Sequence, residues 1–137
     1  MDKKNNKGFS LVELIIVIAI IATLIGVLAP QYLKFVTNSR VATDITNATE
    51  IAKAIDATVS ASDNTGAVPS LIQGPGGTAV TNVSGLTSLP ASKLDAGYEW
   101  IITVDPAVGV QSITLNGYEV YPKGEGVGTF HDQYYVE

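Results

Sequence analysis

The residue with the clearest chemical potential is Glu13, which lies near the start of a long apolar run. No charged residue occurs from Leu14 to Ala29, and the next cation toward the C-terminus is Lys34, beyond helical reach. A carboxylate at mid-membrane costs about 2.5–3.5 kcal/mol, so such a group usually has a function and a partner. Cutting the chain between Gly8 and Phe9 would create an amino group four residues before Glu13.

Few other residues could support chemistry. The chain has no cysteine and one histidine, which excludes disulfides, thiolate metal sites and cysteine nucleophiles. No serine or carboxylate lies in a recognisable catalytic frame, so we expect no enzymatic activity and no cofactor. His131 could join Asp132 and Glu125 in a metal site, but an exposed loop residue is the better interpretation, and no calcium-loop spacing occurs. We therefore expect no metal.

The apolar run is long enough to cross a membrane as a helix. About 20 residues, each rising about 1.5 Å, span a bilayer core. Three lysines precede the run, so the positive-inside rule places the N-terminus in the cytoplasm and the residues after Pro30 outside. A secretory signal peptide would have a shorter apolar core. A plain single-pass anchor would give no reason for Glu13.

The remainder of the chain has the composition of an acidic soluble domain. Because residues 1–8 carry a net charge of +2 and the whole chain −5, the remainder carries −7. Nucleic-acid binding requires basic surface. We therefore predict no direct contact with nucleic acid.

The segment Lys7-Gly8-Phe9-Ser10-Leu11-Val12-Glu13-Leu14, followed by an apolar run ending at Pro30, resembles the class III signal of type IV pilins and pseudopilins. In that pattern a basic leader ends in Gly, followed by Phe, Ser or Thr, an aliphatic pair and Glu. The resemblance implies that a prepilin peptidase cuts after Gly8 and that Phe9 becomes N-methylated. It also implies that Glu13 pairs with the Phe9 amine of a neighbouring subunit during assembly.

The same resemblance implies a function and partners. The protein would be a structural subunit of a type IV pilus, a helical homo-oligomer serving surface adhesion or motility. The alternative is a pseudopilin of a type II secretion or DNA-uptake machine. The subunit would be a single-pass protein of the cytoplasmic membrane before assembly and extracellular afterwards, and it would need the pilus assembly platform and its ATPase. Many pilins close their C-terminal region with a disulfide, which this chain cannot form, as in Gram-positive-type major pilins.

Residue patterns along the chain predict five segments and an α+β fold, in which a long N-terminal helix packs on a small antiparallel β-meander, and the resemblance implies the same arrangement. The segments are a leader at 1–8, a transmembrane and assembly helix at 9–30, an amphipathic helix at 31–62, a Gly/Pro/Ser/Thr-rich connecting region at 63–97, and a sheet with a C-terminal tail at 98–137. Residues from about 42 onward are expected to form a soluble, monomeric domain.

Three residues spaced by four, Ala22, Gly26 and Pro30, share one face of the first helix. Small residues at this spacing let membrane helices approach closely. Pro30 removes a backbone donor, and Gly26 is a poor helix former. The turn between them could stretch or melt when helices pack in a filament, although an ordinary kinked anchor would have the same residues.

After Pro30, apolar residues at steps of three and four predict a helical stripe that packs on the protein's own sheet rather than on a partner helix. The stripe consists of Val41, Ile45, Ala48, Ala52, Ile55 and Val59, and the opposite faces carry Arg40, Asp44, Glu50, Lys53 and Asp56. Stop residues near Ser62–Asn64 should end this helix.

Alternating residues predict three strands, at 98–105, 110–115 and 118–121, joined by turns at Pro106–Gly109 and Asn116-Gly117. These turns would pair Trp100 with Leu115, Ile102 with Ile113, Leu115 with Tyr118, and Ile113 with Val120. One face would then collect these apolar side chains against the helix stripe. Gln133–Val136 could add an edge strand.

Overall fold

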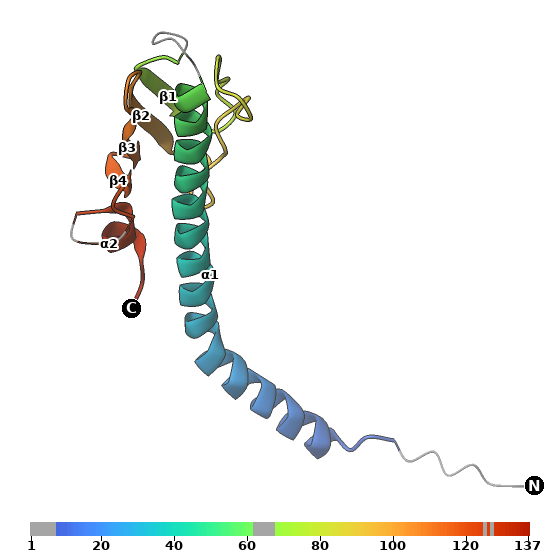
Figure 1. Cartoon of the computed structure of the whole chain (residues 1–137). Helices are drawn as coiled ribbons and strands as arrows, with labels where there is room; N and C mark the ends of the chain where they lie inside the picture. Colours follow the sequence, from blue (N-terminus) through green and yellow to red (C-terminus); the bar gives the residue numbers. More distant parts are fainter. Residues whose placement is uncertain (1–7, 62–67, 125, 127) are drawn as a thin grey trace, which may run out of the picture. The chain divides into compact units, whose positions relative to one another are not determined.

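The computed structural model describes residues 8–61, 68–124, 126 and 128–137. Its elements are α1 (Leu11–Ala61), β1 (Leu71–Pro75), β2 (Glu99–Asp105), β3 (Gly109–Leu115), β4 (Tyr118–Tyr121) and α2 (Phe130–Tyr134) (Figure 1). A long N-terminal helix and a four-stranded antiparallel sheet confirm the predicted α+β class. Residues 1–7 of the leader and the predicted helix end near Ser62–Asn64 lie outside the described residues.

The chain divides into two units, Met1–Phe35 and Val36–Glu137, and α1 contributes to both. In the first unit, every large apolar side chain from Phe9 to Phe35 is at least 47% exposed. Among the described residues, α1 is the one helix that is long and apolar enough to cross a membrane. Such a surface is stable only when lipid or other helices cover it.

The second unit has its own hydrophobic core, formed where the predicted stripe of α1 meets the sheet. Val41, Ala48 and Ile55 are fully buried in one cluster with Trp100 and Ile113. The stripe's other members are Ala52, which is also buried, and Ile45 and Val59, which are partly buried. The expected packing of this helix on its own sheet is therefore confirmed.

The strand order is β1-β2-β3-β4, and most of the predicted register is observed. Trp100 pairs with Leu115 and Ile102 with Ile113, and Leu115 pairs with Tyr118. The prediction that Ile113 pairs with Val120 is wrong: Ile113 pairs with Tyr121, across a bulge in β4. A bulge adds one residue to a strand and changes which neighbours face each other. Val120 nevertheless stays inside, at 2% exposure.

The first turn is also shorter than predicted. Asp105 pairs with Gly109, so Gly109 belongs to β3 and not to the turn, and a second irregularity follows at Thr103/Val104. Gly109 has a φ of +116°, a conformation that glycine adopts readily. A Cβ there would also collide with the carboxylate of Asp56.

Two elements differ from the sequence predictions. β1 lies in the region expected to connect helix and sheet, where Leu71 pairs with Thr103 and Ile72 is buried. Its Gly74 and Pro75 have low strand propensity, so pairing with β2 determines its conformation. At the C-terminus, the suggested edge strand at Gln133–Val136 is wrong, because helix α2 extends through Tyr134.

Candidate functional site

The proposed processing site, Gly8 and Phe9, lies immediately before α1 in chain without regular secondary structure. Both residues are exposed, and the Phe9 side chain is 88% exposed. A Cβ placed on Gly8 would meet no atom within 4 Å. The described structure therefore gives no internal reason for glycine here, and a steric requirement for it would have to come from an external partner.

Glu13 caps the first turn of α1. Its Oε2 accepts a hydrogen bond of 2.8 Å from the backbone N–H of Ser10, and the Ser10 hydroxyl accepts one of 3.2 Å from the N–H of Val12. This reciprocal arrangement is a capping box, in which N-terminal N–H groups without helical partners are satisfied by side chains. The Ser-x-x-Glu spacing at Ser10 and Glu13 is the pattern in the sequence that predicts this cap.

Ala22, Gly26 and Pro30 all lie within α1, and the helix continues through Pro30. A Cβ on Gly26 would meet no atom within 4 Å. Nothing within the described chain packs closely against this glycine. Any close approach that Gly26 permits must involve another molecule.

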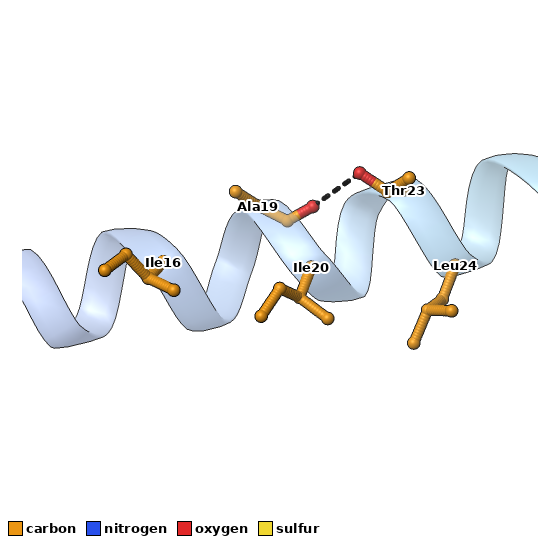
Figure 2. Close-up of a pocket in the computed structure, with 5 residues that line it drawn as sticks. All are labelled: Ile16, Ala19, Ile20, Thr23 and Leu24. Carbon is orange, nitrogen blue, oxygen red and sulfur yellow. Dashed lines mark hydrogen bonds between the residues drawn. The ribbon is translucent and has the colours of Figure 1, made fainter.

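The surface of the first unit has shallow hollows between side chains of a single helix. Ile16, Ala19, Ile20, Thr23 and Leu24 line one of them (Figure 2). The Thr23 hydroxyl donates 2.8 Å to the carbonyl of Ala19, so even this polar group is satisfied within the helix. A similar apolar hollow lies between Ile21 and Tyr32. These surfaces suit apolar side chains or lipid tails and offer no group for catalysis.

His131 lies in α2 rather than in a loop. Its ring stacks on Tyr135, with centroids 4.3 Å apart and an interplanar angle of 20°. Within the described residues, no group of three or more His, Asp or Glu comes together. Glu125, which the sequence suggested as a companion, lies outside the described residues.

The C-terminal segment is held by contacts that the sequence analysis did not anticipate. Thr129 caps α2 by accepting from the N–H of Asp132, and the Asp132 carboxylate accepts 3.0 Å from the N–H of Gly128. Phe130 is fully buried in the core. Tyr134 packs edge-on against Tyr118, with centroids 5.7 Å apart. The Thr129-x-x-Asp132 spacing was the available indication of a helix start.

Beyond α2, the chain end is fixed to α1. The Asn38 side-chain amide donates 2.9 Å to the carbonyl of Val136, and its oxygen accepts 2.9 Å from the Val136 N–H. These contacts and the anchored α2 hold the C-terminal segment without cysteine. No sequence pattern indicated Asn38, because its partner is a backbone group 98 residues away.

Asp44 corrects another sequence interpretation, because it is fully buried and does not lie on the solvent face. Its carboxylate accepts 2.7 Å from the Ser92 hydroxyl and 2.8 Å from the N–H of Lys93. Asp44 follows Val41 by three residues and precedes Ala48 by four, so helical geometry places it on the stripe. That spacing was the missed indication.

Comparison with known protein families finds the prokaryotic N-terminal methylation motif at residues 3–29. This motif is the class III signal peptide of type IV pilins and pseudopilins. The motif supports a type IV pilin-like or pseudopilin precursor, and it implies membrane association and processing by prepilin peptidase. No curated protein and no solved structure matches the chain.

Proposed function

We propose that prepilin peptidase cuts this chain between Gly8 and Phe9, that Phe9 is N-methylated, and that the mature subunit polymerises through α1 into a type IV pilus serving adhesion or motility. Before assembly, the subunit would remain anchored in the cytoplasmic membrane. The assembly platform and its ATPase would then move it into an extracellular filament.

The observation that carries this proposal is an exposed apolar helix with one carboxylate near its start. Every large apolar side chain from Phe9 to Phe35 is at least 47% exposed. Lipid would cover this surface before assembly, and the α1 helices of neighbouring subunits would cover it in the filament. Because apolar faces alone specify an axial position poorly, a polar contact is needed to fix the step between subunits.

Glu13 is suited to provide that contact. A carboxylate has about four acceptor positions, and the hydrogen bond from the Ser10 N–H occupies one of them. The remaining positions could receive the Phe9 amine of a neighbouring subunit after cleavage. An ion pair between subunits would neutralise a carboxylate that is otherwise costly in hydrocarbon.

Ala22, Gly26 and Pro30 would contribute to packing between subunits. The open space beside Gly26 would allow a neighbouring helix to approach closely. Pro30 lacks the N–H that would otherwise stabilise the preceding turn, so that turn could lengthen as helices pack.

The proposal is tested on filaments sheared from cells that express the protein. Electron microscopy should show surface filaments, and mass spectrometry should identify subunits that begin at N-methylated Phe9. Subunits that retain Met1 would contradict the processing step. Loss of secretion or DNA uptake on gene deletion, with no surface filaments at normal expression, would instead indicate a pseudopilin.

A further inference from the structure

The turn between β3 and β4 contains the one Asn-Gly pair in the sequence, Asn116-Gly117. Such a pair can deamidate spontaneously, because glycine has no side chain to shield its backbone nitrogen. That nitrogen loses its proton to solvent and attacks the side-chain carbonyl carbon of asparagine, ammonia leaves, and a succinimide ring forms. Water then opens the ring to aspartate or isoaspartate. Both residues of this pair are exposed, so water, the one co-reactant, can reach them.

The structure restrains Asn116 at its backbone and at its side chain. Its φ is +52° and that of Gly117 is +84°, which are the values of a two-residue hairpin turn. The backbone N–H of Asn116 donates 3.0 Å to the carbonyl of Glu99 in β2. Its side-chain Nδ2 donates 2.9 Å to the hydroxyl of Tyr134. That last bond fixes the group that must leave, and ring closure requires this side chain to rotate toward the backbone nitrogen of Gly117.

Tyr134 is itself held in place by its neighbours at the end of α2. Its ring packs on Phe130, with centroids 4.8 Å apart, and on Tyr98 and Tyr118, with centroids 5.7 Å apart in each case. Phe130 is fully buried in the core. In the part of the chain that the structure describes, the Tyr134 hydroxyl is the one hydrogen-bond partner of the Asn116 side chain. Docking of α2 therefore controls this restraint.

We propose that Asn116-Gly117 is a deamidation site and that the Tyr134 hydroxyl preserves the amide while α2 is docked. Release of α2 frees the side chain to rotate and speeds the reaction. The product carries one additional negative charge, and its carboxylate can no longer donate to Tyr134. Isoaspartate also adds one carbon to the main chain of the turn, next to the pair Leu115 and Tyr118. Deamidation would thus leave a permanent record that α2 has been released.

The test follows deamidation in the full-length chain in detergent micelles, held in mildly alkaline buffer. Peptide mapping by mass spectrometry measures asparagine, aspartate and isoaspartate at position 116 over time. Tyr134→Phe keeps the ring and removes the hydroxyl, so it should deamidate about 2- to 12-fold faster than the wild type, as expected for the loss of one neutral hydrogen bond. Tyr118→Phe is the matched control, because it removes the hydroxyl of a tyrosine that packs on Tyr134, and it should react at the wild-type rate.

Two further measurements separate local release from unfolding. The wild type in urea gives the unrestrained rate, which should exceed that of the folded chain. Hydrogen exchange at Ile113 should show the same protection in Tyr134→Phe as in the wild type, because only the turn is released. If Ile113 loses protection, Thr129→Ala replaces that variant: it removes the cap of α2 and leaves Asn116 and Tyr134 unchanged. It too should speed deamidation.

The proposal is overturned if Tyr134→Phe keeps its fold and deamidates at the wild-type rate. It is overturned equally if the folded wild type reacts as fast as the chain in urea, because the structure would then give no protection. Acceleration in Tyr118→Phe as large as in Tyr134→Phe would assign the effect to general loosening of the aromatic cluster. Where Thr129→Ala is the variant used, a wild-type rate has the same meaning as in Tyr134→Phe.

Discussion

At the scale of single residues, Glu13 combines a helix cap with a negative charge. The hydrogen bond from Ser10 stabilises the first turn of α1, and it needs only an acceptor oxygen. Pairing with an amine of another subunit needs the charge as well. A substitution that keeps the oxygen and removes the charge therefore separates the two roles.

Glu13→Gln should insert, be processed and keep its cap, but assemble poorly. Losing a hydrogen bond to a charged group costs about 1.5–3 kcal/mol, which corresponds to a loss of roughly 10- to 150-fold in each docking equilibrium. The measurement is filament yield relative to the membrane pool in the same cells, with Glu13→Val for comparison. Wild-type filament yield from Glu13→Gln would mean that capping, and not charge pairing, is what assembly requires.

Asp44 illustrates a carboxylate whose role is to hold a loop. It joins α1 to the segment at Ser92–Leu94, and all three of these residues donate to it. Asp44→Ala would leave buried donors without partners and should lower the free energy of unfolding by about 2–4 kcal/mol. Asp44→Asn, which retains one oxygen acceptor, should be intermediate.

Chemical denaturation checks this prediction, with Glu50→Ala as the matched control. Glu50 is an exposed acid on the same helix, and its removal should change stability by no more than about 0.5 kcal/mol. Equal midpoints for Asp44→Ala and Glu50→Ala would contradict the role assigned to Asp44.

Tyr98 should make the domain sensitive to alkaline pH. A hydrogen bond with Tyr134, with smaller effects from burial and from nearby negative charge, raises the pKa of Tyr98 from 10.0 to about 12. Because the folded pKa exceeds the unfolded one, this stabilisation is complete below pH 10 and is lost as the pH rises toward 12. Tyr134→Phe should move the pKa of Tyr98 back toward 10, as followed by NMR of labelled tyrosine. No movement would assign the shift to another cause.

At the scale of elements, the sequence predicted the helix face and the strands that a regular spacing of apolar residues defines. Steps of three and four located the buried stripe of α1, and alternation with an Asn-Gly turn located β2, β3 and β4. β1 was missed because its conformation depends on pairing with a strand about 30 residues later, which no local pattern records. The bulges were missed for a similar reason, since an extra residue changes register without changing alternation nearby.

Polar contacts between distant segments were the least predictable part of the candidate site. The Ser10–Glu13 cap could have been identified from spacing alone, and so could the position of Asp44 on the stripe. Asn38 could not, because its partner is the backbone of Val136 and any residue type there would provide the same groups. The cleavage and assembly roles of Gly8, Phe9 and Glu13 stay predictions.

The packing of α1 on the sheet gives a sharp test at this scale. Ile55 is fully buried, so Ile55→Asp would place an unpaired charge in the core and should cost about 3–5 kcal/mol. Ala57→Asp introduces the same residue at an exposed position two residues later, and it should change stability little. Thermal unfolding of both variants decides the matter: similar melting temperatures would mean that α1 does not form part of this core.

At the scale of the whole molecule, the two units require different surroundings. The first unit exposes apolar side chains along α1, whereas the second buries a complete core of its own. The boundary at residues 35 and 36 lies before the position near 42 where the sequence suggested that the soluble domain begins. The difference matters because α1 contributes two stabilising residues, Asn38 and Val41, within that interval.

A fragment of residues 36–137 should therefore be soluble, monomeric and cooperatively folded, while a fragment of residues 42–137 should be less stable. The shorter fragment loses Val41, which is fully buried in the core, and both hydrogen bonds between Asn38 and Val136. Burial of a valine contributes about 1.5–3 kcal/mol, and each of the two hydrogen bonds about 0.5–1.5 kcal/mol, so the difference should be roughly 2.5–6 kcal/mol. Urea denaturation of both fragments measures this difference directly.

A double substitution in the longer fragment, Asn38→Ala with Val41→Ala, serves as the control, because it removes the same contacts at constant chain length and should reproduce most of the loss. Equal midpoints for the two fragments would show that the domain begins after residue 41, and that the start of the second unit adds nothing to its stability.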